Sequence, residues 1–333
     1  MIGHTWAVDL LAGHISRKQE RHAYLITGSQ GVGRRTLALR FAQGLNCQDP
    51  PSPGQPCRSC STCKRIEGMQ HPDLAIVEAE HEGEVLRIDQ VREMQHSLAL
   101  APYEARYRVA LILRAEEAHS SAANAMLKTL EEPPPQVVVI LTAMSEESLL
   151  PTLVSRCEVV RLRPVNIDET ARGLRAAKNL SAEQASFLAH ISGGRPGYAL
   201  HLAAEPRILE QRKQSIDELV LLLGASRRER FAFANTHTNS KEFTKDDLRN
   251  ELQVWLTLWR DVLIYASGSS DSITNLDYAG WLTDLASQVG MGAAHSYVRS
   301  IEDTIERIER NVNPRLALEV LLLDFPRLQG AER

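Results

Sequence analysis

Short apolar runs alternate with stretches of helical periodicity over the first half of the chain. The runs that predict buried strands cover residues 23–27, 74–77, 109–113 and 137–141. Apolar residues recur every three or four positions over residues 36–45, 89–98 and 120–131, which predicts helices. Strands and helices that alternate in this way predict an α/β fold, a parallel sheet covered by helices.

The pattern changes after residue 163. The rest of the sequence carries helical stripes, such as residues 252–265 and 316–325, with breaks at residues 193–194, 196–197 and 268–270. We therefore predict three domains. An α/β domain covers residues 1–163, a small helical domain covers 164–205, and an all-helical domain covers 206–333.

Composition excludes some classes of protein. The chain has 333 residues, 43% of them hydrophobic, and a formal net charge of −4, so it offers no global attraction to nucleic acid. Its apolar stretches, such as residues 137–144, are far shorter than the ~20 residues of a membrane helix. We expect a cytoplasmic protein with reduced cysteines and no membrane partner.

The segment GSQGVGRRT at residues 28–36 has the glycine spacing of a phosphate-binding loop, G-x-x-x-x-G-K-S/T. Arg34 stands at the lysine position and Arg35 at the hydroxyl position, while Thr36 is one residue late and about 100° further round the helix. The residues alone allow either a tight turn without ligand or weak nucleotide binding, so ATP binding is doubtful. The candidate phosphate-binding residues are Gly28, Gly31, Gly33, Arg34 and Thr36.

An ATPase also needs carboxylates at the end of the next buried strand, where they hold magnesium. Here Arg114 follows the run VALIL, and Glu116 and Glu117 lie beyond the strand end. We expect these two acids to form a solvated turn or helix start. ATP hydrolysis at this site is therefore not predicted.

Four of the five cysteines form a C-x9-C-x2-C-x2-C pattern, which is typical of a metal site. Four thiolates close the coordination shell, so we predict a structural zinc; an iron–sulfur cluster and a contribution from His71 are weaker alternatives. The metal would order a proline- and glycine-rich segment, since zinc sites in small peptides supply about 10–16 kcal/mol. The predicted ligands are Cys47, Cys57, Cys60 and Cys63, whereas Cys157 is predicted to pack as a buried apolar residue.

Two longer segments resemble a known family. These are SSAANAMLKTLEEPPP at residues 120–135 and LLPTLVSRCEVVRL at residues 149–162. They resemble the subunits of bacterial clamp loaders, which belong to the AAA+ family. Further matching segments are HPDL at 71–74, IDQVREM at 88–94, GGRPGYAL at 193–200 and NVNPRLALEVLLLDF at 311–325, so the resemblance covers essentially the whole chain. It implies an AAA+ domain with a zinc module at 47–63, a helical lid and a helical collar.

The resemblance also implies roles for single residues. The Asp-Glu pair of the family's motor subunits, gamma or tau, falls on Leu113 and Arg114, and a second-domain arginine falls on Gly197. In related subunits the arginine of the SRC motif, here Arg156, projects into the nucleotide site of the neighbouring subunit. Without the resemblance, we would expect Arg156 to pair with a local carboxylate such as Glu158.

The expected function is therefore that of a non-catalytic clamp-loader subunit in a DNA polymerase holoenzyme. It would donate Arg156 as an arginine finger, with gamma/tau and delta subunits as partners, and would act on the sliding clamp and primer-template DNA through the complex. One alternative is a motor subunit that hydrolyses ATP at residues 28–36. Another is a zinc-module protein that binds DNA through Arg58, Lys64 and Arg65.

Overall fold

The computed structural model describes residues 1–80, 84–270, 273–310 and 312–328, except residues 240–243. The chain divides into two compact units. The first comprises Met1–Leu180 and Gly194–Tyr198, and the second comprises Ser181–Gly193 and Ala199–Arg333. The three-domain division at residues 163/164 and 205/206 stays a prediction.

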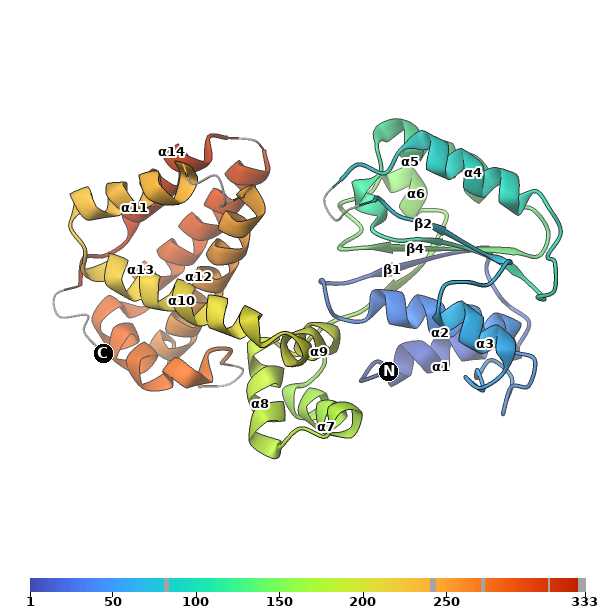
Figure 1. The fold of residues 1–333 in the computed structure, drawn as a ribbon, viewed down its shortest axis with the longest axis horizontal. Coiled ribbons are helices and arrows are strands. Elements are labelled where there is room, and N and C mark those ends of the chain that lie inside the picture. Colours follow the sequence, from blue (N-terminus) through green and yellow to red (C-terminus); the bar gives the residue numbers. More distant parts are fainter. Residues whose placement is uncertain (81–83, 240–243, 271–272, 311, 329–333) are drawn as a thin grey trace. The chain divides into compact units, whose positions relative to one another are not determined.

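The first unit is built on a parallel sheet of five strands in the order β2-β3-β4-β1-β5 (Figure 1). The strands are β1 (Ala23–Thr27), β2 (Leu74–Val77), β3 (Arg108–Ile112), β4 (Val137–Ala143) and β5 (Glu158–Arg161). Each adjacent pair is parallel, so the carboxyl ends of all five strands meet at one edge of the sheet. This confirms the predicted parallel sheet of an α/β fold.

Helices cover both faces of the sheet (Figure 1). One face packs against α1 (Thr5–Ser16), α2 (Arg34–Asn46) and α3 (Ser61–Glu67), and the other against α4 (Ile88–Leu98), α5 (Ser120–Glu131) and α6 (Pro151–Val154). Successive strand residues alternate between the two cores: Tyr24 and Ile26 contribute to the first, and Leu25 to the second.

The predicted strands and helices of this unit are all present. The helix predicted from residue 36 begins two residues earlier, at Arg34, because the loop glycine Gly33 serves as its N-cap. Strand β5 was not predicted, since EVVR is a short edge strand with charged ends. The helix α7 (Ile167–Lys178) completes the described part of the unit, together with the start of α9 (Pro196–Ala204).

The second unit has a helical core of its own. Trp255 and Trp259 are fully buried on one helix, and the indole Nε1 of Trp255 donates to the Ser215 carbonyl at 3.0 Å. This confirms the apolar stripe predicted over residues 252–265. No helix in the described ranges is long and apolar enough to cross a membrane. The helices are α8 (Ala182–Ile191), the rest of α9, α10 (Pro206–Gly224), α11 (Arg227–Asn239), α12 (Lys245–Ala266), α13 (Ala279–Glu309) and α14 (Pro314–Asp324).

A buried carboxylate fixes the connection into β3. Asp73 accepts backbone hydrogen bonds from Tyr103 at 2.6 Å, Glu104 at 3.0 Å and Ala105 at 2.9 Å, and it pairs with Arg108 at 3.3 Å. Burial alone would raise the pKa of Asp73, but the three N–H groups and the Arg108 guanidinium hold it below its usual value. The ionised form is therefore the stabilising one.

Replacing Asp73 with alanine should lower the free energy of unfolding by about 3–5 kcal/mol, because it leaves the buried Arg108 without its carboxylate and three backbone N–H groups without their acceptor. The control is Asp89→Ala, which removes an exposed carboxylate that pairs with Arg92 on the same helix, and should change stability by less than about 0.5 kcal/mol.

The folded-state pKa of Asp73 is depressed, so its contribution is complete above the unfolded pKa of ~3.9 and is lost as pH falls through the folded value. The stability gap between wild type and Asp73→Ala, measured by urea unfolding, should therefore narrow only below about pH 4. A gap that is absent at pH 7 would contradict this account.

Candidate functional site

The segment at residues 28–36 forms a tight loop at the carboxyl end of β1, between the strand and α2. Gly28, Gly31 and Gly33 have φ values of 146°, 78° and 116°, a region that side-chain-bearing residues rarely adopt. The three glycines are therefore required by the backbone. The structure confirms the predicted strand, loop and helix arrangement.

Protein groups contact this loop closely from the start of α9. The Gly197 N–H donates to the Gly31 carbonyl at 2.7 Å, and a Cβ atom on Gly197 would lie only 2.8 Å from that oxygen. A Cβ atom on Gly31 would lie 2.7 Å from the Cβ atom of Tyr198. An arginine therefore does not fit at Gly197 without movement of the backbone. On another side of the loop, the buried ring of His4 lies 3.1 Å from the Val32 carbonyl.

The charge of Arg34 lies beside a carboxylate. Its Nη1 atom is 3.7 Å from Oε1 of Glu116, and the two side chains are 11% and 17% exposed. Glu116 also accepts from the Met144 N–H at 3.1 Å. The expectation of a solvated turn or helix start at residues 116–117 is confirmed in part. These residues lie in a helical turn, η1 (Ala115–Glu117), but their side chains are mostly buried beside arginines instead of solvated.

The next two loop positions point elsewhere. The guanidinium of Arg35 lies 3.1 Å from Sδ of Met69, and the Thr36 side chain is exposed. Neither arrangement resembles a hydroxyl that reaches a magnesium ion at the phosphates.

The end of β3 carries a buried apolar side chain and a cation. Leu113 is buried, and Arg114 has a left-handed backbone with φ of 50°. Nε of Arg114 donates to Glu117 at 2.8 Å, and its Nη1 lies 3.7 Å from Glu78. A guanidinium thus occupies the place where a magnesium site needs a carboxylate.

Arg156 lies in the turn between α6 and β5 and is 34% exposed. Its guanidinium donates to the Thr152 carbonyl at 2.8 Å and to Oε1 of Glu131 at 2.7 Å. The expectation of a carboxylate partner is confirmed, but that partner is not local in sequence: it is Glu131 on α5 and not Glu158. Glu131 was missed because it is 25 residues away in sequence, and only the fold brings the end of α5 beside this turn.

The strand register separates Arg156 from the phosphate loop. In the parallel pair β1–β5, Tyr24 pairs with Glu158 and Thr27 with Arg161. Arg156 therefore lies at the amino ends of the strands, whereas Gly28 follows the carboxyl end of β1. At ~3.3 Å per residue, roughly 15–20 Å separate the backbone at these two positions, too far for an arginine side chain.

The four predicted metal ligands meet at one point. The Sγ atoms of Cys47, Cys57, Cys60 and Cys63 all lie within 4.8 Å of one another, and all five cysteines are free thiols. Cys47 follows the end of α2, while Cys60 caps α3 and Cys63 lies in its first turn. Two helix ends thus hold a four-sulfur set that fits a tetrahedral ion such as zinc.

Hydrogen bonds within the cluster favour thiolates. The backbone N–H groups of Cys57, Cys60 and Cys63 donate to the preceding cysteine sulfurs at 3.3, 3.3 and 3.4 Å. The Ser59 hydroxyl, with backbone N–H groups, lowers the pKa of Cys57 to about 6. Burial raises the pKa of Cys63 above its usual value, so its thiolate needs a nearby positive charge.

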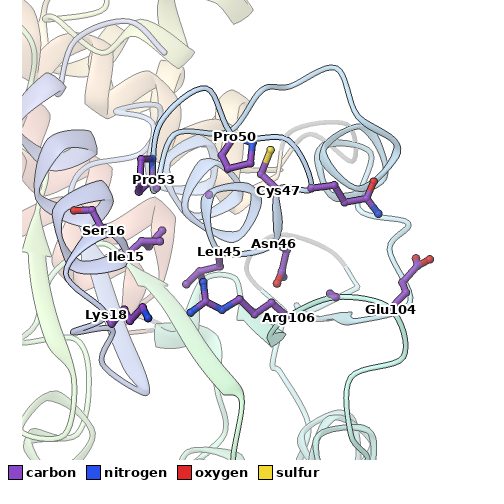
Figure 2. A pocket seen from close by; sticks show the side chains of 14 residues that line it. Ile15, Ser16, Lys18, Leu45, Asn46, Cys47, Pro50, Pro53, Glu104 and Arg106 are labelled. Atoms are coloured by element: carbon purple, nitrogen blue, oxygen red, sulfur yellow. The ribbon is translucent and has the colours of Figure 1, made fainter.

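The segment between the first two cysteines packs against α1. A Cβ atom on Gly54 would lie 2.6 Å from the Ala12 carbonyl, which explains the glycine. A cavity of about 440 Å³ lies between this segment, the ends of α1 and α2, and residues 104–106 (Figure 2). No phosphate-loop residue lines this cavity. Of the basic residues proposed for DNA binding, Arg58 and Lys64 are exposed, whereas Arg65 pairs with Glu104.

Most of the chain matches models of known protein families. Residues 3–166 match the model described as DNA polymerase III, delta subunit, and residues 207–327 match the model of its C-terminal part. A DNA polymerase III subunit delta′ from Bacillus subtilis is 27% identical over 318 residues, which cover 95% of this chain and 94% of the relative. The corresponding subunit of Pseudomonas aeruginosa is 34% identical over 66% of each chain.

The chain also resembles, over part of their length or at lower identity, proteins named for other subunits of DNA polymerase III. DNA polymerase III subunit tau of Escherichia coli is 29% identical over 63% of this chain, but over only 29% of its own length. A solved gamma-subunit-related protein from Thermotoga maritima is 22% identical, with a TM-score of 0.49 over 95% of this chain and 97% of that one. The two family models and the two delta′ relatives together cover most of both units. The chain therefore belongs to the delta′ family of DNA polymerase III clamp-loader subunits.

Proposed function

We propose that this chain acts in trans, by donating Arg156 to the nucleotide site of an adjacent clamp-loader subunit, and that it hydrolyses no ATP itself. The observation that carries the proposal is the position of Arg156, partly exposed at the amino edge of the sheet and far from its own phosphate loop. A cation placed there serves a site on another molecule.

An arginine suits this role chemically. Its guanidinium is always charged and presents a fork of donors that matches phosphate oxygens, so it stabilises the charge that develops on the transferring phosphoryl group. Such arginines contribute ~10³–10⁵ to turnover in related phosphoryl-transfer reactions. While no nucleotide site of a neighbouring subunit is in contact, Glu131 would hold the guanidinium of Arg156 extended. The ion pair is solvent-exposed and therefore weak, so Arg156 could leave Glu131 and bind a phosphate group.

Three features support the absence of hydrolysis at residues 28–36. Arg34 lies beside Glu116, Arg114 replaces a magnesium-binding carboxylate, and Gly197 leaves no room for a second arginine. The alternative, a motor subunit that hydrolyses ATP at residues 28–36, would require catalysis in spite of all three features. ATP would be hydrolysed by the neighbouring subunits.

The proposed partners follow from the relatives. Proteins named gamma and tau match large parts of this chain, and we propose them, with a delta subunit, as its neighbours in the complex. Through that complex the chain would help to open the sliding clamp and to close it on primer-template DNA.

We also propose that the four cysteines hold a structural zinc ion. The ion would supply the positive charge that four neighbouring thiolates require, and would tie residues 47–63 to the end of α2. Four sulfur ligands leave no open position, so no step of a reaction is assigned to it.

Arg156→Ala should leave the chain folded and assembled, and should reduce the ATP turnover of the reconstituted complex by about 10³-fold, because the transition state loses its cation. Steady-state ATP turnover in the presence of clamp and primed DNA measures this. The ATP turnover of the Arg156→Lys complex should be little higher than that of Arg156→Ala, since a lysine ammonium lacks the fork of donors.

The matched control is Arg161→Ala. Arg161 is the last residue of β5, the strand that Arg156 precedes, and it pairs there with Glu146. Its loss should therefore leave turnover within about twofold. Normal turnover with Arg156→Ala, or an equal loss with Arg161→Ala, would rule out the arginine-finger proposal.

The purified chain should retain one zinc ion per molecule after dialysis against metal-free buffer, as measured by elemental analysis. Cys60→Ser and Cys63→Ser should each lose the ion and lower the thermal midpoint, because a site of three thiolates binds far more weakly. Cys157→Ala is the control: burial raises the pKa of this fifth cysteine to about 12, and it lies outside the cluster, so zinc content should not change. Full zinc content in Cys63→Ser would refute the site.

A further inference from the structure

A second group of ligand-type side chains lies in the helical unit, far along the sequence from the cysteines. Glu218 comes from α10, His237 from α11 and Glu251 from α12. Nε2 of His237 lies 3.7 Å from Oε2 of Glu218 and 3.6 Å from Oε2 of Glu251. One ligand atom from each of the three residues lies within 4.8 Å of the others.

Glu251 is the unusual member of this group. Its side chain is only 7% exposed, and within the described ranges no hydrogen-bond donor reaches either carboxylate oxygen. A buried carboxylate without a donor or cation is strongly destabilising, so such groups are normally paired or coordinate a metal. Here the neighbour is a second carboxylate, Glu218, together with one imidazole.

The protonation equilibria show the same conflict. Burial and the nearby Glu218 raise the pKa of Glu251 to about 8, and burial lowers the pKa of His237. Two carboxyl groups and a neutral imidazole thus share this site, and the three residues provide no positive charge to stabilise ionised carboxylates.

We propose that Glu218, His237 and Glu251 bind a divalent transition-metal ion of the zinc type, which clips α10, α11 and α12 together. A histidine nitrogen with two carboxylate oxygens is a donor set for zinc, whereas magnesium and calcium prefer oxygen alone. Glu218 and His237 are partly exposed, so the ion has a path of entry and water can complete its coordination shell.

The geometry fits with small adjustments. Ligands at ~2.0–2.1 Å from a tetrahedral zinc lie ~3.3–3.4 Å apart. The two separations from His237, 3.6 and 3.7 Å, need only slight contraction, and the carboxylate oxygens of Glu218 and Glu251 lie within 4.8 Å of each other. The His237 ring is held in place by Phe233, with 3.9 Å between the ring centroids. The site would therefore be largely preformed.

Zn²⁺ itself is the probe. The full-length chain, already loaded with zinc at its cysteines, is titrated calorimetrically with further Zn²⁺. One additional equivalent should bind, and His237→Gln and Glu251→Gln should each weaken that binding at least about tenfold. The thermal midpoint should rise with added Zn²⁺ in the wild type and not in these variants. Glutamine is neutral and close in shape to the protonated carboxyl group of Glu251, so this variant should fold normally.

The control is His201→Gln. His201 on α9 lies 3.6 Å from Glu205, which precedes α10. Both side chains are exposed and no third ligand-type residue joins them among the described residues, so the additional equivalent should persist. Should either buried-site variant unfold, Glu218→Gln provides the same test at a more exposed position. Absence of a second equivalent in the wild type, or its survival in both His237→Gln and Glu251→Gln, would overturn the proposal.

Discussion

The parallel direction of all five strands is the constraint on which the rest of the first unit depends. It places every carboxyl end, and with it the loop at Gly28, at one edge of the sheet, and every amino end at the other. Arg156 precedes β5, so its charge is confined to the edge away from that loop. The proposed division of labour between subunits depends on this separation, since the cation and the phosphate loop of one chain lie at opposite edges of the sheet.

The phosphate loop has the backbone shape that its glycine spacing predicts, and protein groups contact it closely. Gly31 and Gly33 still take up their left-handed conformations, but the carbonyl of Gly31 is bonded to the first turn of α9. The arginine at position 34 lies beside Glu116. These contacts hold the first turn of α9 and η1 against the loop and the start of α2, so the loop contributes to packing even without a ligand.

Local signals made most of the fold predictable. Apolar runs marked four of the five strands, and the cysteine spacing marked a cluster that the structure assembles from two helix ends. Contacts between distant residues carry no such signal. The pairing of Arg156 with Glu131 and the approach of Gly197 to Gly31 depend on how the chain folds back on itself. The Glu218, His237 and Glu251 group could not be predicted from the sequence either, because its members lie on three different helices. Each residue alone is typical of a solvated helix face.

The central claim is that this polypeptide supplies a charge for chemistry that takes place on another molecule. Magnesium-dependent ATP turnover by the purified chain alone tests it most directly, with Arg34→Ala measured in parallel. The account predicts no turnover above the buffer blank for either protein. Steady turnover by the wild-type chain that disappears in Arg34→Ala would contradict it.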